Sequence, residues 1–151
     1  MRDDLELYWR MYQENTTHGR HHEVQRATLT TVVVAIAAAT VGFIRPHDLP
    51  LGKGYLPLTL LLTLLGLFGA VVTRKHYERF ALHGRRASKY RNKLDSSLPG
   101  IDLKKLKQEA DDEHAKQFPR TSKLSLSWLW VGVHLSVAAI GAVLSILILS
   151  P

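Results

Sequence analysis

Residues 55–73, YLPLTLLLTLLGLFGAVVT, form an apolar stretch that contains no charged residue. At about 1.5 Å per residue, a helix of this length spans about 28 Å, which is enough to cross a bilayer once. The stretch stops at Arg74 and Lys75, and Pro57 lies in its first turn, where a missing N–H costs little. We predict a transmembrane helix over residues 55–73.

Two further apolar blocks flank this stretch. Residues 27–44, ATLTTVVVAIAAATVGFI, are uncharged, and residues 124–149 are long enough to cross a bilayer with some tilt. A soluble protein could bury such helices in its core only if polar residues wrapped all of them, and too few polar residues remain. The predicted fold class is therefore an all-α integral membrane protein with three transmembrane helices.

The distribution of charge sets the expected orientation. The chain carries a net charge of +7, and residues 74–123 hold 14 basic against 7 acidic residues. Positive segments stay on the cytoplasmic side of membranes. We therefore expect the N-terminus and residues 74–123 in the cytoplasm, residues 45–54 as an external loop, and the C-terminus outside.

The cytoplasmic segments are also expected to be helical. Leu5, Tyr8, Trp9 and Tyr12 have the spacing of one helix face, which predicts an amphipathic helix over residues 1–26 that continues into the first span. The basic stalk of residues 74–123 continues the second span as far as Leu98-Pro99-Gly100 and then forms a short helix, which Asp102 can cap.

The extensions of the first two spans are predicted to form a cytoplasmic helical hairpin. Residues at equal height above the membrane should be neighbours, which places Glu14 beside Arg85 or Arg86 and Tyr12 beside Lys89. The acidic N-terminal residues would then neutralise the far end of the basic stalk. This leaves the basic residues nearest the membrane for lipid head groups: Arg26, Arg74, Lys75 and Arg79.

Several classes of function are disfavoured. The chain has no cysteine, which excludes disulfides, thiolate metal sites and cysteine nucleophiles. It has no phosphate-binding glycine loop, no nucleophile elbow and no acidic pair inside a span. We expect no enzyme activity, no catalytic residue, no cofactor and no small-molecule substrate. The basic excess indicates anionic phospholipids rather than nucleic acid as the partner.

Histidine supplies the main candidate chemistry. His18 and His22 are one helical turn apart, a spacing that can chelate a metal, although no carboxylate completes a known pattern. His21, His22 and His76 near the membrane are also candidate pore or proton-sensing residues. The alternative for this group is ordinary interfacial packing, which is more common.

His134 is distinct because it lies inside the third span. A titratable residue at membrane depth suggests a pore or proton relay, and the competing interpretation is a neutral imidazole bonded across a helix interface.

Small residues recur at four-residue spacing in every span. Pairs of this kind let membrane helices approach closely, which favours packing within the chain and association between copies. The glycines predicted to serve helix packing are Gly42, Gly66, Gly132 and Gly141.

The strings YWRMYQENTTHGRHHEVQR (8–26) and KHYERFALHGRRASKYRNKLD (75–95), with LPGIDL (98–103) and WLWVGVH (128–134), resemble the RipA-family octameric membrane proteins of bacteria. The resemblance covers nearly the whole chain. It implies a homo-octamer in the bacterial inner membrane and no established enzyme activity, and it supplies no catalytic residue.

We therefore expect a non-enzymatic homo-oligomer of the inner membrane that acts as a pore or a scaffold. One alternative is a pore-forming effector resembling SLATT-type defence proteins, although the third span counts against it. A second is an enzyme acting on lipid head groups through interfacial histidines and Arg79, which the lack of a nucleophile–base pair disfavours.

Overall fold

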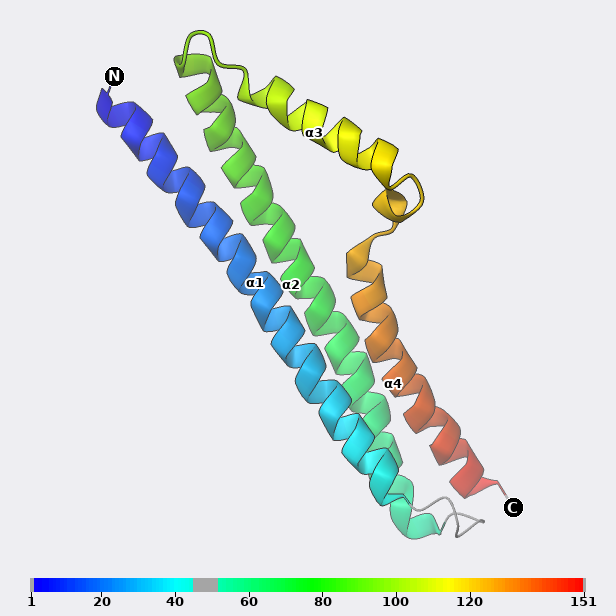
Figure 1. Ribbon diagram of the computed structural model, residues 1–151. Coiled ribbons are helices and arrows are strands. Elements are labelled where there is room, and N and C mark those ends of the chain that lie inside the picture. Colours follow the sequence, from blue (N-terminus) through cyan, green and yellow to red (C-terminus); the bar gives the residue numbers. More distant parts are fainter. Residues whose placement is uncertain (1, 45–51, 151) are drawn as a thin grey trace. The chain divides into compact units, whose positions relative to one another are not determined.

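The computed structural model describes residues 2–44 and 52–150, and within this part of the chain it contains helices and no strand (Figure 1). The predicted all-α fold is confirmed. Most of the expected external loop, residues 45–51, lies outside the described residues. The helices are α1 (Arg2–Phe43), η1 (Lys53–Tyr55), α2 (Leu56–Ser97), α3 (Leu103–Gln117), η2 (Thr121–Lys123) and α4 (Leu126–Leu149).

Both long helices continue well beyond their apolar parts, as predicted. α1 and α2 each have 42 residues, and neither is broken where the apolar sequence meets the charged sequence. Three helices, α1, α2 and α4, are long and apolar enough to cross a membrane.

The chain divides into two compact units. The first consists of Met1–Glu23 and Tyr77–Ser125 and is called the charged unit here; the second consists of Val24–His76 and Leu126–Pro151 and is called the apolar unit. α1 and α2 contribute to both units, α3 belongs to the charged unit and α4 to the apolar unit.

In the charged unit, α1 and α2 pack side by side and antiparallel. The Nδ1 atom of His83 lies 3.1 Å from Oδ1 of Asn15. One turn further along α1, Gly19 faces the ring of Phe80. These pairs are close to the neighbours expected from equal height above the membrane, so the predicted antiparallel register is confirmed.

The connection from α2 to α3 also follows the prediction. α2 ends at Ser97, and Gly100 adopts a φ of 87°, which is easily reached only by glycine. The carboxylate of Asp102 then accepts a hydrogen bond of 2.7 Å from the Lys105 N–H and caps α3. Asp95, near the end of α2, accepts a second bond from the Leu103 N–H, which ties the start of α3 to α2.

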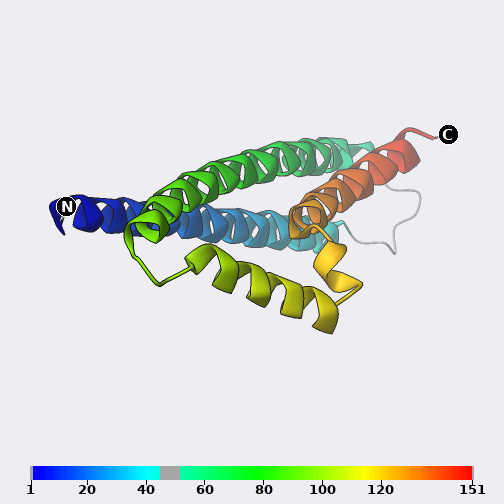
Figure 2. The ribbon, with the colours of Figure 1, turned by 90° about the horizontal axis from the view of Figure 1, so that it is seen from above.

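In the apolar unit, α4 packs against both other helices (Figures 1 and 2). One buried cluster joins Val33 and Ala37 of α1 with Leu62 of α2 and Val137 of α4. α2 and α4 approach so closely that a Cβ atom added to Gly66 would lie 2.6 Å from the His134 carbonyl oxygen. A hydrogen bond of 2.8 Å from the Ser145 hydroxyl to Oγ1 of Thr59 links the same two helices.

The apolar unit buries several polar side chains and exposes many large apolar ones. Thr30, Thr59, Thr73, Ser127, His134 and Ser145 are all buried. Leu60, Leu61, Leu64, Leu67, Phe68 and Val71 of α2 are exposed. A protein surrounded by water would have the opposite arrangement, because exposed apolar surface is unfavourable there.

Candidate functional site

The His134 ring is enclosed by all three helices of the apolar unit. The side chain is 0% exposed, and its Nε2 atom lies 3.0 Å from Oγ1 of Thr30 on α1. On the other side, the ring lies against Gly69 of α2, where a Cβ atom would come within 2.6 Å of the His134 Cε1 atom. The sequence predicted that His134 lies inside the third span. The structure adds that its ring bridges helices of the same chain.

The hydrogen bonds of Thr30 assign the tautomer of His134. The Thr30 hydroxyl has one proton, and it donates to the Arg26 carbonyl oxygen at 2.9 Å. The bond to His134 therefore needs a proton on Nε2, which the ring donates to Thr30. Nδ1 is buried and has no hydrogen-bond partner among the described residues, so a proton there would be an unsatisfied buried donor. The geometry favours a neutral ring.

Gly69 is a site residue that sequence reasoning missed. No glycine, alanine or serine lies four residues before or after Gly69, so its sequence context does not mark it as a packing glycine. Thr30 was missed for a similar reason, since threonine is common in membrane helices and only the position of His134 gives it a role.

Two arginine–tryptophan pairs lie where α4 begins. The Arg74 guanidinium carbon is 5.1 Å from the centre of the Trp128 ring, and that of Arg26 is 5.4 Å from the Trp130 ring. Arg74, Lys75 and Arg79 are exposed, as contact with lipid head groups requires. Arg26 is only 2% exposed, so its expected head-group contact is corrected: it packs against Trp130 inside the apolar unit.

Three histidine rings stack in the charged unit. The His83 ring of α2 lies 5.3 Å from the His18 ring and 5.7 Å from the His22 ring of α1, with interplanar angles of 30° and 26°. Within α1, the His18 ring is 3.6 Å from the Glu14 carboxylate. The sequence predicted Glu14 beside Arg85 or Arg86, but in the described residues its carboxylate contacts His18 of its own helix instead.

This stack does not have the geometry of a metal centre. Among the described residues, no three His, Cys, Asp or Glu side chains converge on a point that could hold an ion. Burial lowers the pKa of His83 from its ordinary value, and the nearby His18, Arg86, His22 and Arg79 lower the pKa further. His21 is exposed and only approaches His22, with their rings 6.3 Å apart, and His76 is half-buried on α2.

The predicted packing glycines fall into two groups. Gly66 and Gly141 meet neighbouring helix backbone within the chain: a Cβ atom on Gly141 would lie 2.6 Å from the Thr63 nitrogen. Gly42 and Gly132 have nothing within 4 Å of the position a Cβ would take. The first two glycines therefore serve packing within the chain, and the role of the other two remains a prediction about contacts between copies.

Comparisons with known proteins do not extend this description. No protein-family model, curated protein or solved structure in these comparisons matches the chain. The function proposed below therefore rests on the residues and their geometry.

Proposed function

We propose that this chain is a non-enzymatic membrane protein of the bacterial inner membrane, whose copies associate into a ring through the outer faces of α1 and α4. The resemblance to the RipA family suggests eight copies. Three helices of sufficient length, leucine-rich outer residues on α2 and two arginine–tryptophan pairs at the start of α4 support insertion into a membrane.

The observation that carries the association is the size of the residues on the outer faces. On α1, the face opposite the buried Val33 and Ala37 consists of small exposed residues: Thr28, Thr31, Ala35, Ala38, Ala39 and Gly42. On α4, Gly132, Ser136 and Ala139 form a shorter exposed patch of small residues, with the larger Leu129 and Val143 exposed at its two ends. The outer face of α2 carries large side chains instead. In lipid, small residues let helices pack closely, whereas leucine and phenylalanine suit contact with acyl chains.

The register within the apolar unit indicates which residues would meet. Thr30 lies beside His134, and Ile44 packs with Ile148, so α1 and α4 run parallel with a constant offset. Ala35 and Ala139 therefore lie at similar depth and both are exposed. In a ring whose copies stand at the same depth, Ala35 of one copy would face Ala139 of the next.

The position of His134 favours a scaffold over a pore lined by this histidine. The ring is fully buried among helices of one chain, so it does not line an outer face that could surround a central channel. A His134-dependent pore would have to pass through the interior of each copy.

Disulfide cross-linking tests the proposed interface directly, because the chain has no cysteine of its own. Membranes containing the Ala35→Cys/Ala139→Cys double variant are treated with a mild oxidant and separated by denaturing electrophoresis. We expect a ladder of cross-linked species, and its highest band counts the copies in the ring. Each single variant should give at most a dimer.

A matched control uses the outer face of α2. The Leu64→Cys/Phe68→Cys variant places two thiols on a face that should contact lipid, and it should not form a ladder. A ladder from this control, or a monomer from the α1–α4 pair in mild detergent, would contradict the proposed interface. Ion flux in liposomes that is lost in His134→Leu would replace the scaffold with a pore.

A further inference from the structure

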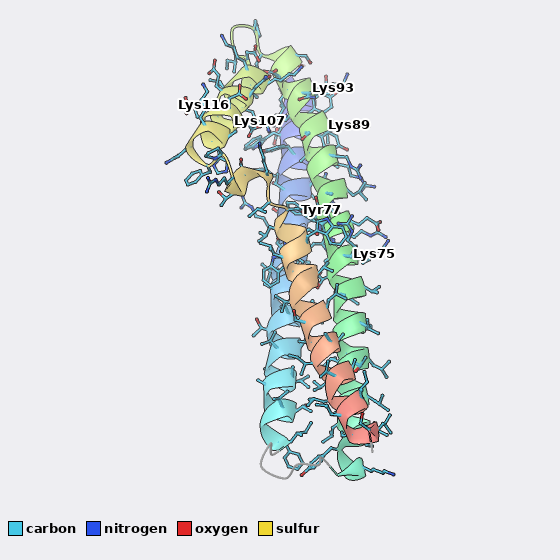
Figure 3. The ribbon with its side chains drawn as sticks, turned by 90° about the vertical axis from the view of Figure 1, so that its right-hand side faces the viewer. Lys75, Tyr77, Lys89, Lys93, Lys107 and Lys116 are labelled. Carbon is cyan, nitrogen blue, oxygen red and sulfur yellow. The ribbon has the colours of Figure 1, made fainter. Side chains whose placement is uncertain are left out.

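A hollow on the charged unit lies between α1 and the last turns of α2. It has a volume of about 550 Å³, and its lining residues include Tyr8 of α1 with Arg86, Lys89, Tyr90 and Lys93 of α2. Small-molecule sites commonly have volumes of about 300–1,000 Å³, so this groove is large enough for one. Figure 3 shows Lys89 and Lys93 one helical turn apart on α2.

The positive charges of this groove have no acidic partner in its lining. Ion pairs elsewhere in the described part of the charged unit join Glu6 to Arg10, Lys105 to Glu109 and Lys107 to Asp111. None of these involves Arg86, Lys89 or Lys93, and no acidic residue lines the groove. Three like charges gathered on one wall repel each other, and a bound anion would relieve that repulsion.

The remaining lining defines the chemical class of the anion. Tyr8 and Tyr90 are half-buried and contribute aromatic surface, and Asn92 and Ser96 supply neutral hydrogen-bonding groups. Aromatic side chains stack on flat ring systems, whereas lysine and arginine bind phosphate oxygens. A bare inorganic ion would use only the cationic part of the groove.

We propose that this groove binds an organic phosphate with a planar ring, the chemistry of a mononucleotide. Arg86, Lys89 and Lys93 hold the phosphate, and Tyr8 and Tyr90 contact the ring. The site lies wholly within the charged unit. The proposal is therefore independent of the α1 and α4 faces through which copies are proposed to associate.

Titration calorimetry on the full chain in phosphatidylcholine nanodiscs tests the site, with adenosine monophosphate as the probe. We expect saturable binding that weakens at least tenfold in Lys89→Gln/Lys93→Gln. Tyr8→Leu should weaken binding by a similar factor, and Tyr8→Phe should retain it because the ring is preserved.

The matched control removes the same charge elsewhere in the charged unit. Lys104 and Lys116 are exposed on α3 and have no ion pair among the described residues, so Lys104→Gln/Lys116→Gln should leave binding within twofold of the unchanged protein. An equal loss in this control would overturn the site in favour of general attraction to positive charge.

Two further probes separate the parts of the ligand. Adenosine, which lacks the phosphate, and glycerol phosphate, which has a lipid head group's phosphate and no ring, should each bind at least tenfold more weakly than adenosine monophosphate. Glycerol phosphate that binds as tightly as the nucleotide would overturn the assigned ligand class, as would an absence of saturable nucleotide binding.

Discussion

Gly69 of α2 lies directly against the ring of His134 of α4. A Cβ atom at position 69 would come within 2.6 Å of the His134 Cε1 atom, and Thr30 of α1 holds the same ring from the other side at 3.0 Å. The imidazole thus occupies space that exists only because residue 69 has no side chain, and it connects all three helices of the apolar unit.

The first prediction concerns this contact. Gly69→Ala should destabilise the protein by about 1–3 kcal/mol, because a methyl group would be forced against the imidazole. Removing the ring should relieve the clash, so Gly69→Ala/His134→Ala should lose less stability than the sum of the single variants. Thermal unfolding in one detergent measures the stability of the two single variants and the double variant.

Gly84→Ala is the control for this prediction. Nothing lies within 4 Å of the place a Cβ atom would take at Gly84, so this variant should be neutral or stabilising by about 0.5–1 kcal/mol. Purely additive single variants would contradict the contact.

Gly66 should behave differently from Gly69. A Cβ atom at Gly66 would collide with the backbone of α4, including the carbonyl oxygen of His134 at 2.6 Å. Backbone cannot be removed by shortening a side chain, so Gly66→Ala should remain destabilising in the presence of His134→Ala. Rescue of Gly66→Ala by that substitution would show that α4 can shift away from α2. The same unfolding assay distinguishes the outcomes.

The third prediction concerns pH. The pKa of His83 is lowered by burial and by His18, Arg86, His22 and Arg79 in the folded protein, so below the ordinary value of 6.5 the unfolded chain binds a proton more readily. Stability is therefore fully present above about pH 6.5 and is lost as the pH falls towards the lowered pKa of the folded state. The melting temperature of the protein should fall between pH 7.5 and pH 5.

The control for the pH effect is His83→Gln, which keeps an N–H group that can donate to Asn15 and removes the titration. Its melting temperature should depend less on pH over the same range. The neighbours Glu14, His18 and His22 remain in this variant. If the pH dependence of its melting temperature is unchanged, these neighbours rather than His83 cause the effect.

The fourth prediction concerns orientation in the membrane. Ser97 at the end of α2 and Ser150 after α4 are both exposed, and the absence of native cysteine allows each to be labelled alone as Ser97→Cys or Ser150→Cys. A maleimide that cannot cross membranes should label position 150 on intact spheroplasts. It should label position 97 only after permeabilisation. The reverse pattern would show that the positive segment lies outside.

Much of the fold follows from local sequence rules. The break at Leu98-Pro99-Gly100, the Asp102 cap and the uninterrupted course of α1 and α2 depend on residues close together in the chain. The antiparallel register was also predictable, because two continuous helices joined by a short connection meet at equal height.

Features that depend on the placement of α4 were not predictable. Gly42, Gly66, Gly132 and Gly141 have the same local sequence signature, and only the packed structure shows that Gly66 and Gly141 are used within the chain. From its place in the sequence, Arg26 is expected to contact lipid head groups. Only the structure shows that Arg26 is buried and that its guanidinium group packs against the Trp130 ring. In both cases the deciding partner lies more than sixty residues away.

The small-residue faces of α1 and α4 differ from each other, and this has a consequence for mixtures of damaged and intact copies. An association that joins one face to the other is directional, so every incomplete ring has one unused α1 face and one unused α4 face. A copy with a bulky residue on a single face, such as Gly132→Phe, could still join through its intact face and would then stop further growth. Such a variant should suppress assembly of co-expressed intact protein, whereas a copy with both faces blocked should have no such effect.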